Sequence, residues 1–244
     1  MNDRIDAVFF DLDGTLVHDG AGDAVRQTAH ELARRHGLDA DAILAANAEV
    51  WSGCWAEQGE RWMRGELPSD ALPREIWRLT LADLGRDDEA LLDEAAQLHV
   101  RAERGTFTLF AETLAVLEEL RSDGIPLGVI TNGPAEFQRA KLVTVGIDGL
   151  FDVVVASGDI GVLKPASEIF VRALDGLGVA AGRAIHVGDN FAADVVGAAD
   201  AGMTAVWINR DAVVAPRSDV AHRDIRSLRD VLVEPAQKTG ILRG

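Results

Sequence analysis

The later part of the chain alternates short apolar runs with amphipathic segments, and this alternation restricts the fold more than any other feature. The expected strands are Leu127–Ile130, Val153–Ala156, Ala184–Val187 and Ala205–Ile208. The segments between them carry the apolar spacing of helices. Short apolar strands separated by amphipathic helices are typical of a parallel sheet that helices cover on both faces. We therefore predict an α/β protein with a doubly wound, Rossmann-like core.

One more apolar run, Ile5–Phe10, comes near the start of the chain and leads directly into Asp11. It is short and favours β-structure, so we expect it to be a buried strand of the same sheet. The helices expected around the sheet are Ala111–Arg121, Ala135–Val145, Ser167–Leu177, Ala193–Ala201 and Ile225–Val233.

Between the first strand and the rest of the sheet the pattern is helical throughout. The expected helices are Ala24–His36, Ala40–Gln58, Ser69–Leu84 and Asp88–Arg104, and their expected ends are Gly37, Gly59, Gly85 and Gly105. An insert of about 85 residues is long enough for a small domain. We predict a core domain of residues 1–18 and 106–244 and a four-helix cap of residues 19–105. Because ligands of open α/β sheets bind beyond the carboxyl ends of the strands, such an insert would cover the site.

Composition excludes several classes of function. The chain of 244 residues is 48% apolar and 26% charged, as expected of a soluble globular protein. Its formal charge of −16 argues against a nucleic-acid partner and against an anionic membrane surface. Cys54 is the only cysteine, so no internal disulfide can form, and the first apolar run is too short for a signal peptide. We therefore expect a cytoplasmic protein.

Four polar clusters lie at or just after the ends of the predicted strands. They are residues 11–15, residues 131–133, Lys164 with Pro165, and residues 188–190 followed by Asp194. Because parallel strands end at one edge of a sheet, we expect the four clusters to converge. Carboxylates gathered this closely need a cation between them, and oxygen ligands without His or Cys favour Mg²⁺.

The first cluster divides into distinct chemical roles. Asp11 ends the strand and would be held rigidly, as a nucleophile should be, and a carboxylate can accept a phosphoryl group. Asp13 lies two residues further on and is the candidate general acid and base. Gly14 allows a sharp turn and lets its amide approach an anion. This arrangement favours phosphoryl transfer.

The second and third clusters supply candidate groups for binding the phosphate. Thr131, Asn132 and the amide of Gly133 precede Pro134, which we expect to be the first residue of a helix. The amino end of a helix attracts phosphate oxygens, and Lys164 offers an ammonium for the same anion. The chain otherwise uses arginine for positive charge and contains three lysines, Lys141, Lys164 and Lys238.

With these four motifs in order, the chain resembles the haloacid dehalogenase superfamily, in the form that has a helical cap inserted after the first motif. The motifs are residues 11–16, residues 131–133, Lys164 with Pro165, and residues 188–190 with Asp194. The similarity of pattern extends from Phe110 to Arg210. Only about 30 residues separate the second motif from the third, too few for another small domain, so the cap is assigned to the first insertion.

The resemblance implies a role for each acidic residue of the motifs. Asp11 would be nucleophile and metal ligand, and Asp13 would be acid and base with its backbone carbonyl on the metal. Asp189 would be the third protein ligand of Mg²⁺, with Asp194 and Asn190 supporting the site. Superfamily members that cleave carbon–halogen bonds lack the second aspartate, so the presence of Asp13 favours phosphoryl transfer.

We therefore predict a magnesium-dependent phosphatase that hydrolyses a small organic phosphate through an aspartyl-phosphate. A phosphomutase on the same core is the main alternative, and a dehalogenase or a non-catalytic binding module is disfavoured. The partner would be a small phosphorylated metabolite, for which sugar phosphates, nucleoside monophosphates and phosphoglycolate-like acids all stay open. Trp51 and Trp55 are four residues apart, a spacing that predicts packing between cap helices. The sequence gives no indication of the oligomeric state.

Overall fold

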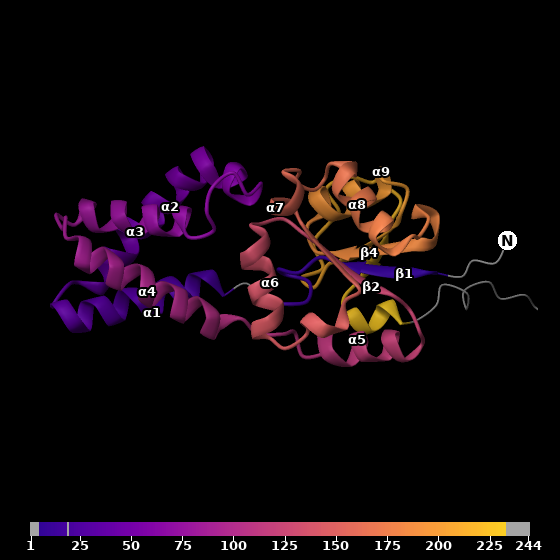
Figure 1. The fold of residues 1–244 in the computed structure, drawn as a ribbon, viewed down its shortest axis with the longest axis horizontal. Coiled ribbons are helices and arrows are strands. Elements are labelled where there is room, and N and C mark those ends of the chain that lie inside the picture. Colours follow the sequence, from indigo (N-terminus) through magenta and orange to yellow (C-terminus); the bar gives the residue numbers. More distant parts are fainter. Residues whose placement is uncertain (1–4, 19, 233–244) are drawn as a thin grey trace, which may run out of the picture.

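The computed structural model describes residues 5–18 and 20–232, so Lys238 and the last residue of the expected helix 225–233 lie outside the described residues. Within the described part, six parallel strands form one sheet in the order β3-β2-β1-β4-β5-β6. They are β1 (Ala7–Phe10), β2 (Leu127–Thr131), β3 (Val153–Ala156), β4 (Ala184–Gly188), β5 (Thr204–Ile208) and β6 (Arg223–Ile225). The predicted doubly wound parallel sheet is confirmed (Figure 1).

Each face of the sheet has its own apolar core. Successive side chains of a strand point to opposite faces, so Val8 and Phe10 pack in one cluster while Ala7 and Phe9 pack in the other. The first cluster includes residues of α5 (Thr113–Ser122) and α6 (Ala135–Thr144), and the second includes residues of α8 (Ser167–Leu177) and α9 (Gly197–Asp200). Burial on both faces explains why β1 reads as a continuous apolar run.

Four helices follow β1 and lie beyond the carboxyl ends of the strands (Figure 1). These cap helices are α1 (Ala21–His36), α2 (Ala40–Met63), α3 (Ala71–Asp83) and α4 (Glu89–Thr106). They enclose apolar clusters of their own, one centred on Trp77 and another on Trp62 and Cys54. Among the described residues, no helix is both long enough and apolar enough to cross a membrane.

Two glycines that were expected to end helices lie inside them instead. Helix α2 continues through Gly59 to Met63, and α4 continues through Gly105 to Thr106. At Gly59 the reason is packing, because a Cβ atom there would lie 2.9 Å from the ring of Trp55. This glycine therefore makes room for an aromatic side chain within the helix. The ends expected at Gly37 and Gly85 agree with the structure, where both glycines have positive φ.

The C-terminal part differs from the expected single helix at 225–233. Arg223–Ile225 forms β6, which pairs with β5, and a short 3₁₀ helix at Leu228–Val231 follows. Ile225 lies in this edge strand, and Leu228 and Val231 of the 3₁₀ helix are buried in the same core cluster. Upstream, the helix expected at 193–201 begins two residues earlier as a π-helical segment, Phe191–Val196, before α9. A further short helix, α7 (Ser157–Ile160), was not expected.

Candidate active site

The acidic residues of the first and fourth motifs meet at the carboxyl edge of the sheet. Asp11 follows β1, and its amide donates to the carbonyl of Val187 in β4 at 2.8 Å. Carboxylate oxygens of Asp11, Asp189 and Asp194 all lie within 4.8 Å of one another. Neighbouring parallel strands thus bring together side chains that are more than 170 residues apart in the sequence.

Lys164 lies between two of these carboxylates and is almost fully buried. Its Nζ donates to Asp11 Oδ1 at 2.6 Å, to Asp194 Oδ1 at 2.7 Å and to the carbonyl of Ile130 at 2.8 Å. An ammonium has three hydrogens, so these partners use all of them. The lysine therefore orients the Asp11 carboxylate, and a phosphate oxygen would have to share or replace one of these contacts.

The carboxylates carry more negative charge than the single ammonium offsets. Burial raises the pKa of Asp11 well above its ordinary value, although the charge of Lys164 lowers it. The charges of Asp194 and Asp189 raise this pKa further. Burial and the charge of Asp194 likewise raise the pKa of Asp189. For Asp194, burial is outweighed by Lys164 and by a hydrogen bond with His186, and its pKa falls to about 2. An all-oxygen site with excess negative charge fits a hard divalent cation.

Gly14 permits the close approach of the two halves of this site. It has a φ of 76°, and a Cβ atom there would lie 2.4 Å from Asp189 Oδ2. Its amide donates to the carbonyl of Val17 at 2.8 Å within the turn. In this structure the amide is thus used within the turn, and its contact with an anion stays a prediction. The glycine is needed because the turn packs directly against the Asp189 carboxylate.

The second motif is held by contacts with the third motif and with α7. Asn132 Oδ1 accepts from the backbone amide of Lys164 at 2.8 Å, and its Nδ2 donates to the Lys164 carbonyl at 3.1 Å. The amide of Gly133 donates to Ser157 Oγ at 2.8 Å. These two groups were expected to bind phosphate, but in this structure they join loops of the protein. Buried backbone and amide groups need such partners when no ligand supplies them.

Asp13 faces two residues of α6 that the sequence analysis did not select. Lys141 Nζ lies 2.7 Å from Asp13 Oδ1 and 2.8 Å from Oδ2, and Gln138 Nε2 lies 3.1 Å from Oδ2. Positions three apart on a helix share a face, so both side chains can reach one carboxylate. The sequence feature that could have identified Lys141 is the scarcity of lysine. It drew attention to Lys164, and it holds equally for Lys141.

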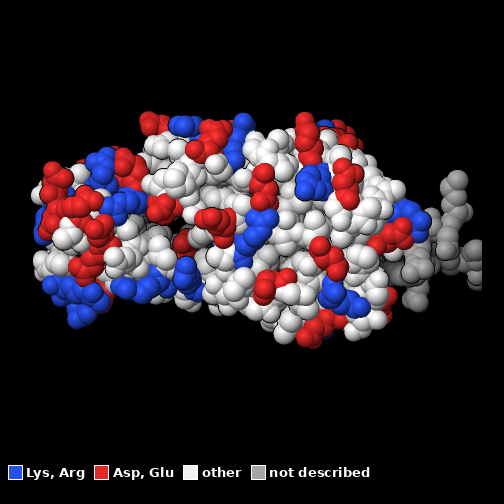
Figure 2. Space-filling model, viewed as in Figure 1, with Lys and Arg blue, Asp and Glu red and all other residues white. Residues whose placement is uncertain are grey.

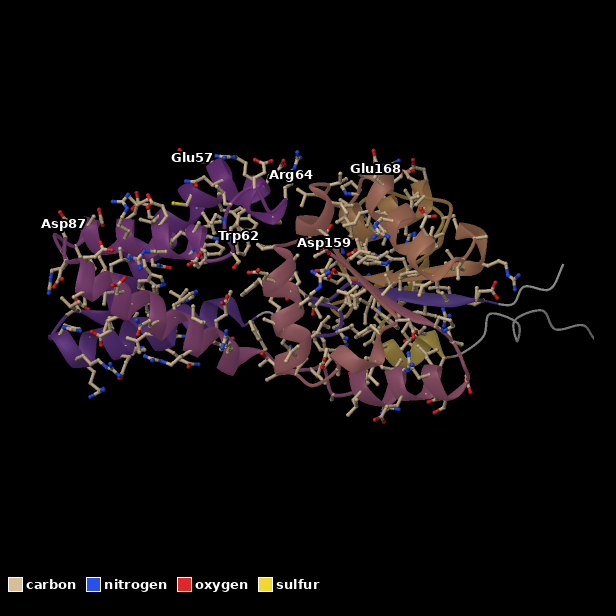
Figure 3. All side chains as sticks on the ribbon, viewed as in Figure 1. Glu57, Trp62, Arg64, Asp87, Asp159 and Glu168 are labelled. Carbon is tan, nitrogen blue, oxygen red and sulfur yellow. The ribbon has the colours of Figure 1, made fainter. Side chains whose placement is uncertain are left out.

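The end of α2 contacts the core beside the second motif. Ser157 Oγ donates to the carbonyl of Met63 at 2.6 Å, so one hydroxyl connects the cap helices with Gly133. The ring centroids of Trp62 and Phe137 are 5.9 Å apart. Figure 3 shows Trp62 on the side of α2 that faces α6.

Two tryptophans do not pack as their spacing predicted. Trp51 and Trp55 are each 37% exposed, and they stack on each other with centroids 5.5 Å apart instead of packing between helices. Figure 2 shows a hollow among the cap helices. Acidic and basic side chains are interspersed over the face of the molecule in this view.

Comparisons with known proteins agree with this architecture. Residues 5–202 match the family model of haloacid dehalogenase-like hydrolases. A phosphoserine phosphatase of Thermus thermophilus is 34% identical over 94% of this chain and 98% of its own. A glyceraldehyde 3-phosphate phosphatase of Methanothermobacter thermautotrophicus is 32% identical over 93% of this chain and 99% of its own.

Solved structures of both phosphatases and dehalogenases have the same fold. A HAD phosphatase from Thermococcus onnurineus superposes with a TM-score of 0.64 at 30% identity, covering 93% of this chain and 96% of that one. A 2-haloacid dehalogenase from Pseudomonas syringae superposes with a TM-score of 0.71 at 27% identity, with the same coverage of both chains.

Proposed function

Because the chain belongs to the haloacid dehalogenase-like hydrolase family, we propose that it is a magnesium-dependent phosphatase acting through an aspartyl-phosphate on Asp11. Its phosphatase relatives make it a phosphoric monoester hydrolase. The observation that carries this proposal is the cluster of Asp11, Asp189 and Asp194, in which Asp11 and Asp194 are buried around Lys164 and Asp189 is exposed. We place the enzyme in the cytoplasm, where its single cysteine stays reduced.

Asp11 is the nucleophile. Lys164 binds its Oδ1 at 2.6 Å and leaves Oδ2 to attack phosphorus. A nucleophile fixed by a short charged hydrogen bond at the end of a strand loses little freedom on reaching the transition state. Lys164 is in turn fixed by Asp194, whose Oδ2 accepts from the amide of Asn190 at 3.0 Å.

Asp13 acts as general acid and then as general base. In the first half of the reaction its proton goes to the leaving oxygen of the ester. In the second half the resulting carboxylate takes a proton from the water that attacks the aspartyl-phosphate. Asp13 is 37% exposed at its side chain, so it lies open enough to meet both leaving group and water.

The carboxylates of Asp11 and Asp189 and the backbone carbonyl of Asp13 would hold Mg²⁺. When bound, the ion neutralises negative charge on the phosphate and on the carboxylates. Thr131, Asn132, Gly133 and Lys164 would contact the phosphate from the strand ends near the start of α6. Gly14 would contact it from the turn after β1, once its amide leaves the carbonyl of Val17. For Gly133 this requires its amide to leave Ser157 Oγ, a contact that substrate would replace.

The substrate is a small phosphorylated metabolite, and the cap helices, within the proposed cap domain of residues 19–105, would cover it. Retention of Asp13 favours phosphate esters over haloacids, although a dehalogenase has the same fold. Closure of the cap would exclude bulk water during the first half of the reaction.

Replacing the nucleophile tests this proposal directly. The Asp11→Asn variant should lose turnover of p-nitrophenyl phosphate with Mg²⁺ by at least about 10³-fold, because an amide cannot form the phosphoryl intermediate. Asp175→Asn, which changes an exposed carboxylate of α8, should keep the activity of the wild type. Undiminished activity of Asp11→Asn would refute the assignment, and conversion of a sugar phosphate to its isomer without free phosphate would favour a mutase.

A further inference from the structure

We propose that Lys141 is a positioning residue for Asp13, and that Gln138 assists it. This inference rests on the proposed function, because it concerns how the acid and base of that reaction is held. The contacts are short and come from one helix: two from Lys141 Nζ, at 2.7 and 2.8 Å, and one from Gln138 Nε2, at 3.1 Å. Lys141 is buried, and its ion pair is with Asp13.

The position of Lys141 is fixed by its surroundings. Its side chain is only 10% exposed, and its Nζ lies 4.5 Å from the ring centroid of Phe137 and 5.6 Å from that of Phe107. Aromatic faces attract an ammonium and limit where it can move. The ammonium of Lys141 therefore lies beside two aromatic rings and pairs with Asp13.

Gln138 connects the same carboxylate to the second motif. Its Nε2 also lies 2.6 Å from Thr131 Oγ1 and 3.0 Å from the carbonyl of Asn132. Because α6 starts directly after this motif, the helix fixes Asp13 and the proposed phosphate site relative to each other. Helix α6 thereby sets the distance between the carboxylate of Asp13 and the leaving oxygen of a bound ester.

These contacts are compatible with both halves of the proposed reaction. As Asp11 attacks phosphorus, the bond from phosphorus to the leaving oxygen breaks and Asp13 gives that oxygen its proton. In the second half a water oxygen attacks phosphorus, the bond to Asp11 breaks, and the water proton passes to Asp13. Both Asp13 oxygens accept from Lys141 in this structure, so the oxygen that carries or receives the proton has to give up its contact while the other keeps accepting.

The aromatic site of Lys141 also reaches the cap. Phe137 contacts Trp62 of α2, and Phe107 follows the last residue of α4. Docking of the cap helices therefore places Trp62 against Phe137, one of the two rings beside Lys141. Asp13 would be held best when the cap lies against the core, as it does here.

Esters with different leaving groups distinguish a loss of acid positioning from a general loss of active-site structure. p-Nitrophenolate departs without a proton, whereas an alkoxide needs one, so only alkyl esters depend on Asp13 in the first half of the reaction. We expect Lys141→Met to lower kcat/KM for glycerol phosphate by about tenfold or more and for p-nitrophenyl phosphate by less than about threefold. The Asp13→Asn variant sets the full size of this difference.

Three further variants complete the experiment. Lys141→Arg should recover much of the activity toward glycerol phosphate that Lys141→Met loses. Gln138→Leu should show the same selective loss on a smaller scale. It replaces Lys141→Met in the experiment if that variant does not fold. Arg139→Met is the control on the same helix as Lys141, and it removes an exposed ion pair between Arg139 and Asp159 of α7. This variant should leave the ratio of the two kcat/KM values unchanged. Equal losses on both esters, or none, would overturn the role of Lys141. An inactive wild type would instead refute the proposed function itself.

Discussion

At the scale of single residues, the site combines side chains that repel one another and would separate in water. Asp11 and Asp194 both accept from the buried ammonium of Lys164, and Asp189 adds a third carboxylate within 4.8 Å of them. The fold holds them because Asp11 directly follows β1, while Asp189 and Asp194 follow the adjacent strand β4. The repulsion between these carboxylates lowers the stability of the folded protein, and a divalent cation bound between them would offset it.

Gly14 allows a residue-scale test of this geometry. The Gly14→Ala variant would place a Cβ atom 2.4 Å from Asp189 Oδ2. We expect kcat/KM to fall by at least about tenfold, because a shift of an ångström at a catalytic group is costly. Gly124→Ala is the matched control, with a φ of 73° and open space around it, so it carries only the backbone strain. Similar activity in the two variants would show that contact with Asp189 is unimportant.

His99 in α4 provides a prediction about pH. Burial lowers its pKa from 6.5 to about 4, and its Nδ1 has no hydrogen-bond partner among the described residues. The unfolded chain therefore binds more protons between these two values, and stability is lost as pH falls from 6.5 toward 4. The loss of unfolding free energy from this residue is about 3 kcal/mol.

Denaturant unfolding of wild type and His99→Leu at several pH values measures this effect. Both proteins contain the same carboxylates, so the difference between their curves isolates the histidine. We expect the free-energy difference to shift in favour of the variant as pH falls from 6.5 to 4. Parallel curves across this interval would contradict the buried, neutral histidine.

At the scale of elements, the unexpected helix α7 connects the cap helices with the core. Its first residue, Ser157, bonds both Met63 at the end of α2 and Gly133 after β2. The backbones approach closely beside it, since a Cβ atom on Gly65 would lie 2.8 Å from the carbonyl oxygen of Gly158. This small contact is the place where the position of the cap can influence the second motif.

Removing one hydroxyl tests the contact. Ser157→Ala leaves the Met63 carbonyl and the Gly133 amide without this partner, at a cost of about 1–3 kcal/mol. We expect Tm to fall by several degrees and amide hydrogen exchange to accelerate in peptides covering residues 62–66 and 133. Ser122→Ala, which removes an exposed hydroxyl bonded to the Glu118 carbonyl, should change neither. Unchanged exchange at both segments would mean that Ser157 does not hold the cap.

At the scale of the whole molecule, the same fold serves more than one chemistry. The structure resembles a dehalogenase and a phosphatase to similar extents, so the fold alone does not select the reaction. In the proposed function the selection would depend on residues such as Asp13 at the sheet edge. It would depend as well on a cation bound at the acidic cluster.

Binding of Mg²⁺ should therefore appear in the stability of the whole protein. A ligand present at 100 times its Kd stabilises the native state by about 2.7 kcal/mol, so Tm should rise with Mg²⁺ in the absence of substrate. Asp189→Asn should melt above the wild type without Mg²⁺, because one repelling carboxylate is gone, and should respond little to the ion. The Asp175→Asn protein should respond like the wild type. A full response of Asp189→Asn would exclude Asp189 as a ligand.

The sequence by itself determined the architecture and the convergence of the acidic residues. Strand-length apolar runs specify β-strands, and parallel strands ending at one edge bring Asp11 and Asp189 together. It also indicated the helical insert after β1. Such features follow from local periodicity and from topology.

Only the tertiary structure decided which side chains contact one another across elements. Lys141 with Asp13, Ser157 with Met63, and the stacked pair of Trp51 and Trp55 depend on how each helix is rotated and how closely it docks. Periodicity identifies the buried face of a helix, but it does not say which residue of a distant element lies opposite. Packing of the complete chain sets that choice, because each such contact joins segments whose separation no local pattern encodes.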